Sequence, residues 1–129
     1  MSRYRRDYTP GATYFFTVVT YRRRPFLCDG DVRAALRDAI QQTRLKYPFI
    51  IEAWVLLPDH LHCLWRLPPD DCDHSTRWNL IKRRVTKTCA ARLHVAEWMN
   101  DSKRKHREST LWQRRHIEHP LCQARCRLP

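Results

Sequence analysis

Long apolar runs are missing from this sequence of 129 residues, and the longest run covers only residues 53–57. A membrane-spanning helix needs about 18 or more consecutive apolar residues, so the sequence predicts none. Residues 1–10 are basic and aromatic, and they contain no apolar segment of the kind that a secretory signal requires. We therefore expect a cytoplasmic protein.

Cysteine pairs of the CxxC type are also missing. The six cysteines are irregularly spaced, so we expect free and mostly buried thiols rather than a disulfide framework. Four potential zinc ligands do lie close together near the end of the sequence, namely His116, His119, Cys122 and Cys126. Their spacing is not that of a standard zinc finger and Pro120 interrupts it, so a coincidental arrangement is favoured over structural zinc.

Acidic residues are scarce, since 13 Asp and Glu stand against 25 Lys and Arg and leave a net charge of +12. The imbalance is concentrated after residue 73, where 14 basic side chains accompany 4 acidic ones. A solvated charged surface would explain a single basic run, but an excess on this scale favours an anionic partner. Nucleic acid is the commonest such partner. A hydrophobic content of 43% suits one folded domain.

The first half of the chain predicts a strand, a helix and two further strands. Residues 13–20 are rich in β-branched and aromatic residues, which are typical of a strand. Asp31 is the expected cap of an amphipathic helix that ends before Pro48. Residues 49–57 are apolar on both faces except for one glutamate and predict a central strand buried on both sides. A tight turn then leads into an antiparallel strand at residues 60–67.

The second half predicts a helix and a less apolar fourth strand. Ser75 is the expected cap of the helix, and Trp78 lies on its apolar stripe, where core packing is favoured over stacking on a base. Residues 100–109 form a polar, basic linker, and residues 110–119 predict the fourth strand. The order of elements is that of the ferredoxin-like split βαβ sheet, an α+β fold with two helices on one face. The other face is then available for a site.

Two histidines on the third predicted strand share one face. Side chains alternate along a strand, so His60 and His62 point the same way, whereas Leu61 and Cys63 point toward the helices. Beside Asp59, the two imidazoles can bind one divalent cation. Two ligands suit a Mg²⁺ or Mn²⁺ ion that also takes phosphate oxygens and water. For an isolated pair of this kind, the alternative is two half-buried histidines with no shared task.

The surrounding sequence favours the metal site. The segment WVLLPDHLHCLW at residues 54–65 closely resembles the HUH motif of REP-associated tyrosine transposases. The likeness runs from about residue 3 to residue 119. In the first half it includes YRR at 4–6 and GATYFFTV at 11–18. In the second half it includes the acidic loop at 70–73, STRWNLIK at 75–82, WQRR at 112–115 and EH at 118–119. The resemblance implies an HUH endonuclease-like domain at residues 1–119 and a divergent tail at residues 120–129.

The resemblance also implies an activity, which is metal-dependent cleavage and rejoining of single-stranded DNA beside a hairpin through a phosphotyrosine link. His60 and His62 would be the metal ligands. In the family, the nucleophilic tyrosine lies on a helix after the segment that matches residues 112–119. No tyrosine follows Tyr47 here, so we expect a C-terminally truncated member without its nucleophile or third ligand, and a relocated tyrosine is disfavoured.

Binding of single-stranded or hairpin DNA is a separate expectation. The side chains expected to contact phosphates are Arg77, Lys82, Arg83, Lys87, Arg114 and Arg115, and those at positions 82, 83 and 87 are expected to face solvent. A non-catalytic nucleic-acid-binding module that keeps hairpin recognition is the alternative to a transposase. An RNA-binding domain is disfavoured, because the central strands lack the aromatic signature of such domains.

Overall fold

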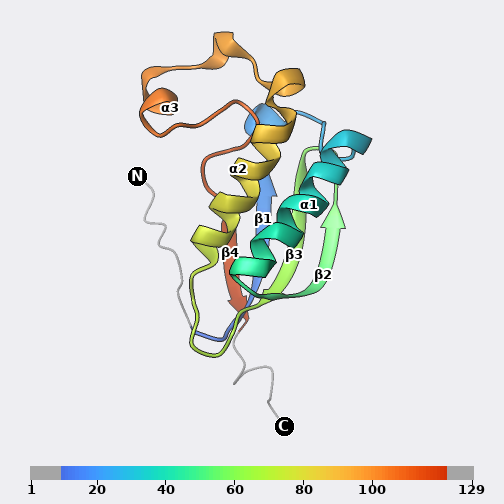
Figure 1. Ribbon diagram of the computed structural model, residues 1–129, viewed down its shortest axis with the longest axis vertical. Helices are drawn as coiled ribbons and strands as arrows, with labels where there is room; N and C mark the ends of the chain where they lie inside the picture. The colour runs from blue at the N-terminus through green and yellow to red at the C-terminus, as the bar shows by residue number, and fades with distance from the viewer. Residues whose placement is uncertain (1–9, 122–129) are drawn as a thin grey trace.

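The structure follows the predicted order of elements. The computed structural model describes residues 10–121, and within them the chain forms four strands and two long helices (Figure 1). The elements are β1 (Thr13–Val19), the 3-10 turn η1 (Tyr21–Arg23), α1 (Gly30–Lys46), β2 (Ile50–Leu56), β3 (His60–Arg66), α2 (His74–Leu93), the 3-10 turn η2 (Ala96–Trp98), α3 (Asp101–Lys105) and β4 (Ile117–Leu121). No helix in this part of the chain is long and apolar enough to cross a membrane.

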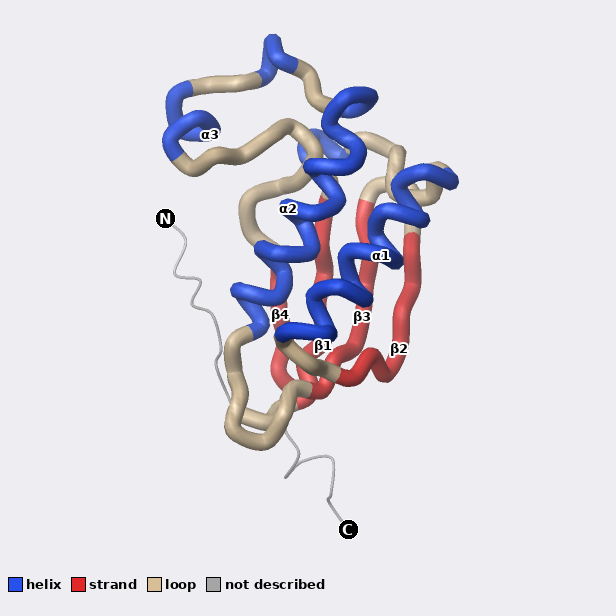
Figure 2. The backbone as a smooth tube through the Cα atoms, in the orientation of Figure 1, coloured by secondary structure: helices blue, strands red, loops and turns tan. Residues whose placement is uncertain are grey.

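The strands form one antiparallel sheet in the order β2-β3-β1-β4. α1 and α2 lie next to each other across one face of this sheet (Figures 1 and 2). The two long helices leave the opposite face uncovered, and we call it the open face. This arrangement confirms the predicted ferredoxin-like split βαβ fold.

The core lies between the helices and the sheet. Alternate residues of β1 and β3 point into it, and Phe16, Leu61 and Trp65 are each completely buried. Trp78 of α2 stacks on Trp65 with ring centroids 4.4 Å apart, which confirms its predicted packing role. Burying a large apolar side chain contributes about 2–3 kcal/mol. The alternation that fills the core therefore also determines which residues are left on the open face.

The second strand is an edge strand, which corrects the prediction of a central strand buried on both faces. Among the described strands, only β3 pairs with β2, and Ile50 and Val55 remain 47% and 52% exposed. A short run of residues that are apolar on both faces is typical of a central strand. The same pattern also occurs in this edge strand, where the helices cover one face and the other face stays exposed. The pairing is irregular between Ile51 and Ala53, as is common at sheet edges.

Both long helices begin slightly earlier than predicted. α1 follows Asp29 rather than Asp31, and α2 follows Asp73 rather than Ser75. Oδ1 of Asp73 accepts a hydrogen bond from the backbone N–H of Thr76 at 3.0 Å, which is the usual role of an N-cap side chain. Several polar residues lie before each helix, and only the backbone geometry selects the one that caps it.

The fourth strand is shorter and begins later than predicted. β4 begins at Ile117 and pairs with β1, whereas residues 110–116 lie outside the sheet ladder apart from one isolated bridge. The predicted linker at residues 100–109 contains the short helix α3. β4 continues through Leu121, and the rest of the predicted tail, residues 122–129, lies outside the described residues.

The cysteines within residues 10–121 are free thiols, as predicted. Cys63 and Cys89 are buried, and Cys28 is exposed. Burial raises the pKa of the Cys63 thiol far above its ordinary value. Because the thiolate is the reactive form, Cys63 serves as an apolar packing group in the core.

Candidate functional site

The open face carries both predicted metal ligands. His60 and His62 occupy alternate positions on β3, and both are half-buried on the side away from the helices. Their ring centroids lie 4.9 Å apart, with the ring planes at 78° to each other. The strand alone therefore brings the two imidazoles together.

The turn before β3 holds the ring of His60. Its Nδ1 atom lies 2.7 Å from Oδ1 of Asp59, and Oδ2 of Asp59 accepts a hydrogen bond from Arg23 at 3.3 Å. The hydrogen bond with His60, assisted by that with Arg23, lowers the pKa of Asp59 despite its partial burial. A charged Asp59 favours a proton on Nδ1 of His60, which leaves Nε2 with its lone pair free for a metal ion.

A strand neighbour holds the ring of His62 in the same way. Thr17 of β1 lies directly opposite His62, and Oγ1 of Thr17 is 2.9 Å from Nδ1 of the histidine. The ring of Phe15 stacks on that of His62 with centroids 5.3 Å apart. A partner at Nδ1 that fixes the orientation of the ring is typical of histidines that bind metals through Nε2.

Sequence reasoning grouped His119 with a possible zinc set and did not predict that it lies on the same open face as His60 and His62. It pairs with Phe15 across β1 and β4, and the two rings stack with centroids 6.3 Å apart. Phe15 therefore contacts both His62 and His119. The signal in the sequence is the alternation along β4, where Glu118 is buried and its neighbours Ile117 and His119 are exposed.

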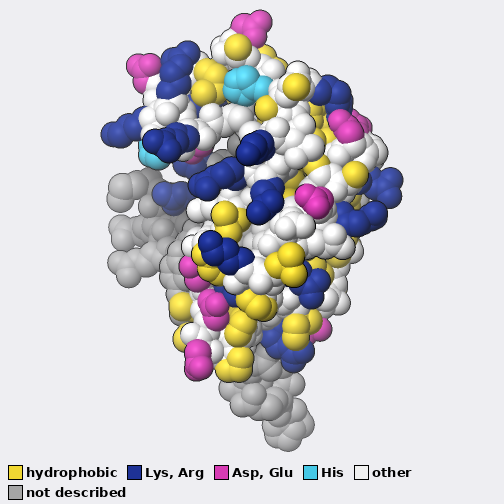
Figure 3. Space-filling model, in the orientation of Figure 1, with side chains coloured by type: hydrophobic (Ala, Val, Ile, Leu, Met, Phe, Trp, Pro, Cys, Tyr) yellow, Lys and Arg dark blue, Asp and Glu magenta, His cyan; other side chains and the backbone are white. Residues whose placement is uncertain are grey.

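Four of the residues predicted to contact DNA are exposed. Arg83 and Lys87 lie on α2, and Arg114 and Arg115 precede β4. Arg83, Arg107 and Arg114 line a pocket of about 360 Å³ between α2 and residues 106–114, which we call the basic pocket. Figure 3 shows Lys and Arg side chains gathered over α2 and the chain that follows it.

The basic pocket lies at the same end of the sheet as the histidines. The backbone N–H of Gln113, which lines the pocket, donates to the carbonyl of Val19 at 3.0 Å. Val19 lies directly opposite His60 in the pairing of β1 with β3. The segment that forms one wall of the pocket therefore runs along the end of β1, one strand away from His60.

Arg77 is buried, which corrects its prediction as a DNA contact. Its side chain is 1% exposed, and its guanidinium donates to both carboxylate oxygens of Asp71, at 3.1 and 2.8 Å. It also donates to the carbonyls of Tyr47 and Pro48. Arg77 therefore joins the loop before α2 to the end of α1. It is inside because it lies next to Trp78 in the sequence, on the flank of the apolar stripe of α2.

Lys82 is also buried, at 8% exposure, so the prediction that it faces solvent is wrong. Its Nζ atom donates to the carbonyls of Gln113 and Arg114 at 3.3 and 3.5 Å. Its own carbonyl accepts a hydrogen bond from Nε1 of Trp112 at 3.2 Å. A lysine can bury its aliphatic stem beside a core and still direct its ammonium to polar partners. Lys82 thus fastens the wall of the basic pocket to α2.

Comparison with known proteins identifies the family. The sequence at residues 9–121 matches the family model described as "Transposase IS200 like". The chain belongs to the IS200-like transposase family. The ferredoxin-like sheet that carries the open-face histidines is therefore the fold of a member of this family.

Individual relatives support the same family assignment. A REP-associated tyrosine transposase of Escherichia coli (strain K12) is 39% identical over 121 residues, which cover 94% of this chain and 62% of that protein. A Haemophilus influenzae relative is 39% identical over 120 residues, covering 92% and 65%. A solved structure of a REP-associated tyrosine transposase bound to a REP hairpin superposes with a TM-score of 0.76 at 37% identity, and covers 98% of this chain and 66% of that one. The chain thus spans less than two thirds of the length of these relatives.

The tyrosines of this transposase chain that the structure describes lie away from the open-face histidines. Tyr14 is completely buried on the helix side of the sheet. The ring of Tyr21 packs against a lysine of α3, and Tyr47 lies at the end of α1. Tyr4 and Tyr8 lie outside the described residues.

Proposed function

We propose that this transposase chain binds single-stranded or hairpin DNA and holds a divalent cation between His60 and His62. The observation that carries the proposal is the pair of Nδ1 contacts, from His60 to Asp59 and from His62 to Thr17, which occupy both Nδ1 atoms and leave Nε2 as the metal-binding atom of each ring. Hairpin DNA as the partner is supported by the similar transposase whose structure was solved with a REP hairpin.

The chemistry follows from the donor set. A divalent ion bound there would withdraw charge from the oxygens of a scissile phosphate and stabilise the charge that develops on them during cleavage. Two imidazoles leave several coordination positions for phosphate and water, which suits an ion shared with the substrate. Imidazole nitrogen is softer than the oxygen ligands that Mg²⁺ prefers. Of the two predicted ions, Mn²⁺ is therefore the better match to His60 and His62.

The basic pocket supplies the contacts that hold the DNA backbone. Arg83, Arg107 and Arg114 line one pocket, and guanidinium groups bind phosphate oxygens in a bidentate manner. The guanidinium of Arg114 also donates to Glu108 and Ser102, so a phosphate there would compete with Glu108. Because the wall of the pocket runs along the end of β1, a DNA strand bound there can continue over the end of the sheet to the two histidines. Lys87 and Arg115 are exposed basic residues on the same two segments, α2 and the chain before β4.

Cleavage is the step that this chain is expected to lack. In the family a tyrosine attacks the phosphate, and this sequence contains no tyrosine after Tyr47. We therefore propose that the 129-residue chain binds metal and DNA without forming a covalent link to the DNA on its own. The second candidate is a non-catalytic nucleic-acid-binding module, and the lack of a tyrosine after Tyr47 favours it too. It differs from the first in that DNA binding would not require a metal ion.

A labelled hairpin separates these functions. The chain is incubated with a 5′-labelled single-stranded hairpin and Mn²⁺ or Mg²⁺; bound DNA, covalent adducts and Mn²⁺ affinity are measured separately. We expect hairpin binding without an adduct, and loss of Mn²⁺ binding in the His60→Ala/His62→Ala double variant. His94→Ala, a histidine at the end of α2, is the matched control. Unchanged Mn²⁺ affinity in the double variant would refute the metal site, and an adduct abolished by His60→Ala would show that this chain cleaves.

A further inference from the structure

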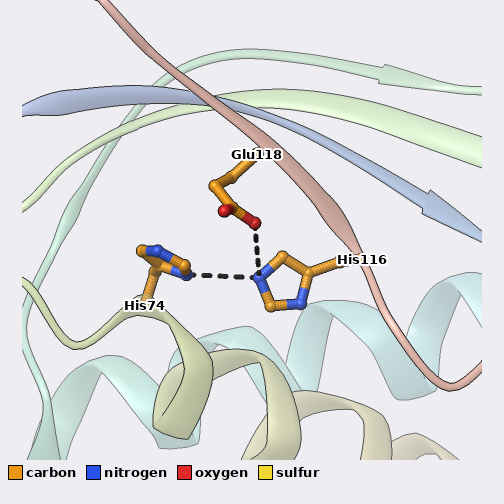
Figure 4. A group of neighbouring side chains, drawn as sticks. All are labelled: His74, His116 and Glu118. Atoms are coloured by element: carbon orange, nitrogen blue, oxygen red, sulfur yellow. Dashed lines mark hydrogen bonds and ion pairs between the residues drawn. The ribbon is translucent and has the colours of Figure 1, made fainter. Parts of the chain in front are cut away.

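A second group of metal-binding side chains lies on the helix-covered side of the sheet. His74 is the first residue of α2, His116 precedes β4, and Glu118 lies within β4. Their exposed fractions are 0%, 2% and 5%. Figure 4 shows the three side chains pointing toward one another from these two parts of the chain.

The spacing of the ligand atoms suits a single transition-metal ion. Nδ1 of His74 lies 3.2 Å from Nε2 of His116, and the latter atom lies 3.9 Å from Oε1 of Glu118. All three ligand atoms lie within 4.8 Å of one another. Zinc bonds of about 2.0–2.1 Å in tetrahedral geometry place neighbouring ligand atoms about 3.3 Å apart, so small side-chain movements would bring this group into coordination.

Aromatic rings enclose the group. Tyr14 and Phe16 lie against His74, with ring centroids 4.8 and 5.4 Å from that of the histidine, and Trp78 lies 5.9 Å from His116. The group therefore lies in the core between α2 and the sheet, on the side away from His60 and His62.

This group is separate from the open-face histidines. His116 is buried on the helix side, whereas His119 is exposed on the open face. The sequence pattern that suggested zinc placed these two histidines in one ligand set, and the structure directs them to opposite sides of the sheet. The buried set takes its second histidine from α2 instead.

We propose that His74, His116 and Glu118 form a buried structural metal site of the zinc class, distinct from the His60 and His62 site and independent of the proposed DNA chemistry. Two histidines and one glutamate are the zinc ligand set of some catalytic sites, in which a water takes the fourth position. Here a water or a further side chain would complete the coordination. The ion would fasten β4, which is paired only to β1 among the described strands, to the start of α2. It would thereby hold the strand that presents His119 on the open face.

Metal content and metal-dependent stability test the site. The chain is stripped with a chelator and titrated with Zn²⁺, and with Co²⁺ as a spectroscopic probe, and the midpoint of thermal unfolding is followed. We expect one tightly bound Zn²⁺ in the wild type and in the His60→Ala/His62→Ala variant, with a rise of several degrees in the midpoint on binding. The double variant is the matched control, because it keeps the buried group intact.

The complementary variants remove the buried ligands. Glu118→Gln keeps the shape of the side chain and is expected to weaken Zn²⁺ binding at least about tenfold, and His74→Phe is expected to abolish it. Circular dichroism checks that each variant is folded. The site is refuted if the double variant binds no Zn²⁺ or Co²⁺, a result that requires no substitution in the core. A midpoint that does not respond to Zn²⁺ would also refute it and leave an imidazolium–carboxylate pair.

Discussion

Oγ1 of Thr17 lies 2.9 Å from Nδ1 of His62, across the pairing of β1 with β3. This hydrogen bond joins the first strand of the sheet to a proposed metal ligand 45 residues later in the chain. The hydroxyl occupies Nδ1 and fixes the orientation of the ring. The metal affinity of the site is therefore expected to depend on a residue that does not touch the ion.

Thr17→Val tests that dependence. Valine keeps the β-branched shape that suits a strand and removes the hydroxyl, so we expect Mn²⁺ affinity to fall about tenfold with little change in thermal stability. Mn²⁺ binding is measured by calorimetry or by electron paramagnetic resonance. Thr17→Ser, which keeps the hydroxyl, is the control and should bind nearly as the wild type does. Equal affinities for the valine and serine variants would contradict the role assigned to this hydrogen bond.

The basic pocket predicts a change in salt dependence. Arg83→Ala or Arg114→Ala should weaken hairpin binding and reduce the slope of log affinity against log salt by about 0.7–0.9 for each phosphate contact that is lost. Arg37 of α1 is an exposed arginine in a different groove, between α1 and β2, and Arg37→Ala is the matched control. Equal loss of slope in the Arg37 variant would place the DNA elsewhere on the surface.

Arg77 is predicted to act on stability rather than on DNA affinity. Arg77→Met removes a buried guanidinium and leaves Asp71 without its bidentate partner, so we expect a loss of about 3 kcal/mol in the free energy of unfolding. Arg66→Met removes a surface pair with Glu52, whose side chains are 51% and 37% exposed, and should cost less than about 1 kcal/mol. Urea unfolding measures both. An Arg77 variant of normal stability that loses DNA affinity would restore the original prediction of a DNA contact.

The same ion pair predicts a response to acid. The hydrogen bonds from Arg77 hold the pKa of Asp71 below its ordinary value of 3.8. The unfolded chain therefore binds a proton at this carboxyl more readily than the folded chain does, and the stability from the pair is complete above pH 3.8 and is lost as the pH falls through the lower pKa of the folded state. Asp71→Asn should reduce the loss of stability between pH 7 and about 3.

Asp70→Asn, at an exposed neighbouring position, is the control. The free energy of unfolding is measured with urea at a series of pH values from 7 down to about 3. Identical acid profiles for the Asp71 variant and the wild type would contradict the assignment.

Local patterns predicted the parts of the molecule that depend on local geometry. The alternation of side chains along a strand was sufficient to place His60 and His62 together and to direct Leu61 and Cys63 into the core. Helical spacing was sufficient to place Trp78 inside. It was not sufficient for Arg77 and Lys82, because both lie on the flank of the apolar stripe, where the neighbouring segments decide whether a long side chain is buried or free.

The order of strands and helices was a property of the sequence by itself, and it determined the fold class. The scarcity of acidic residues and the HxH pair were also properties of the sequence, and they predicted an anionic partner and metal ligands on the open face. Only the tertiary structure decided that β2 lies at the edge, that Thr17 holds His62, and that His74 meets His116 and Glu118 inside the molecule. The physical reason is that the alternation along a strand and the spacing along a helix indicate only which way a side chain points within its own element. Which distant side chains then meet depends on how strands pair and how helices pack across segments more than 40 residues apart.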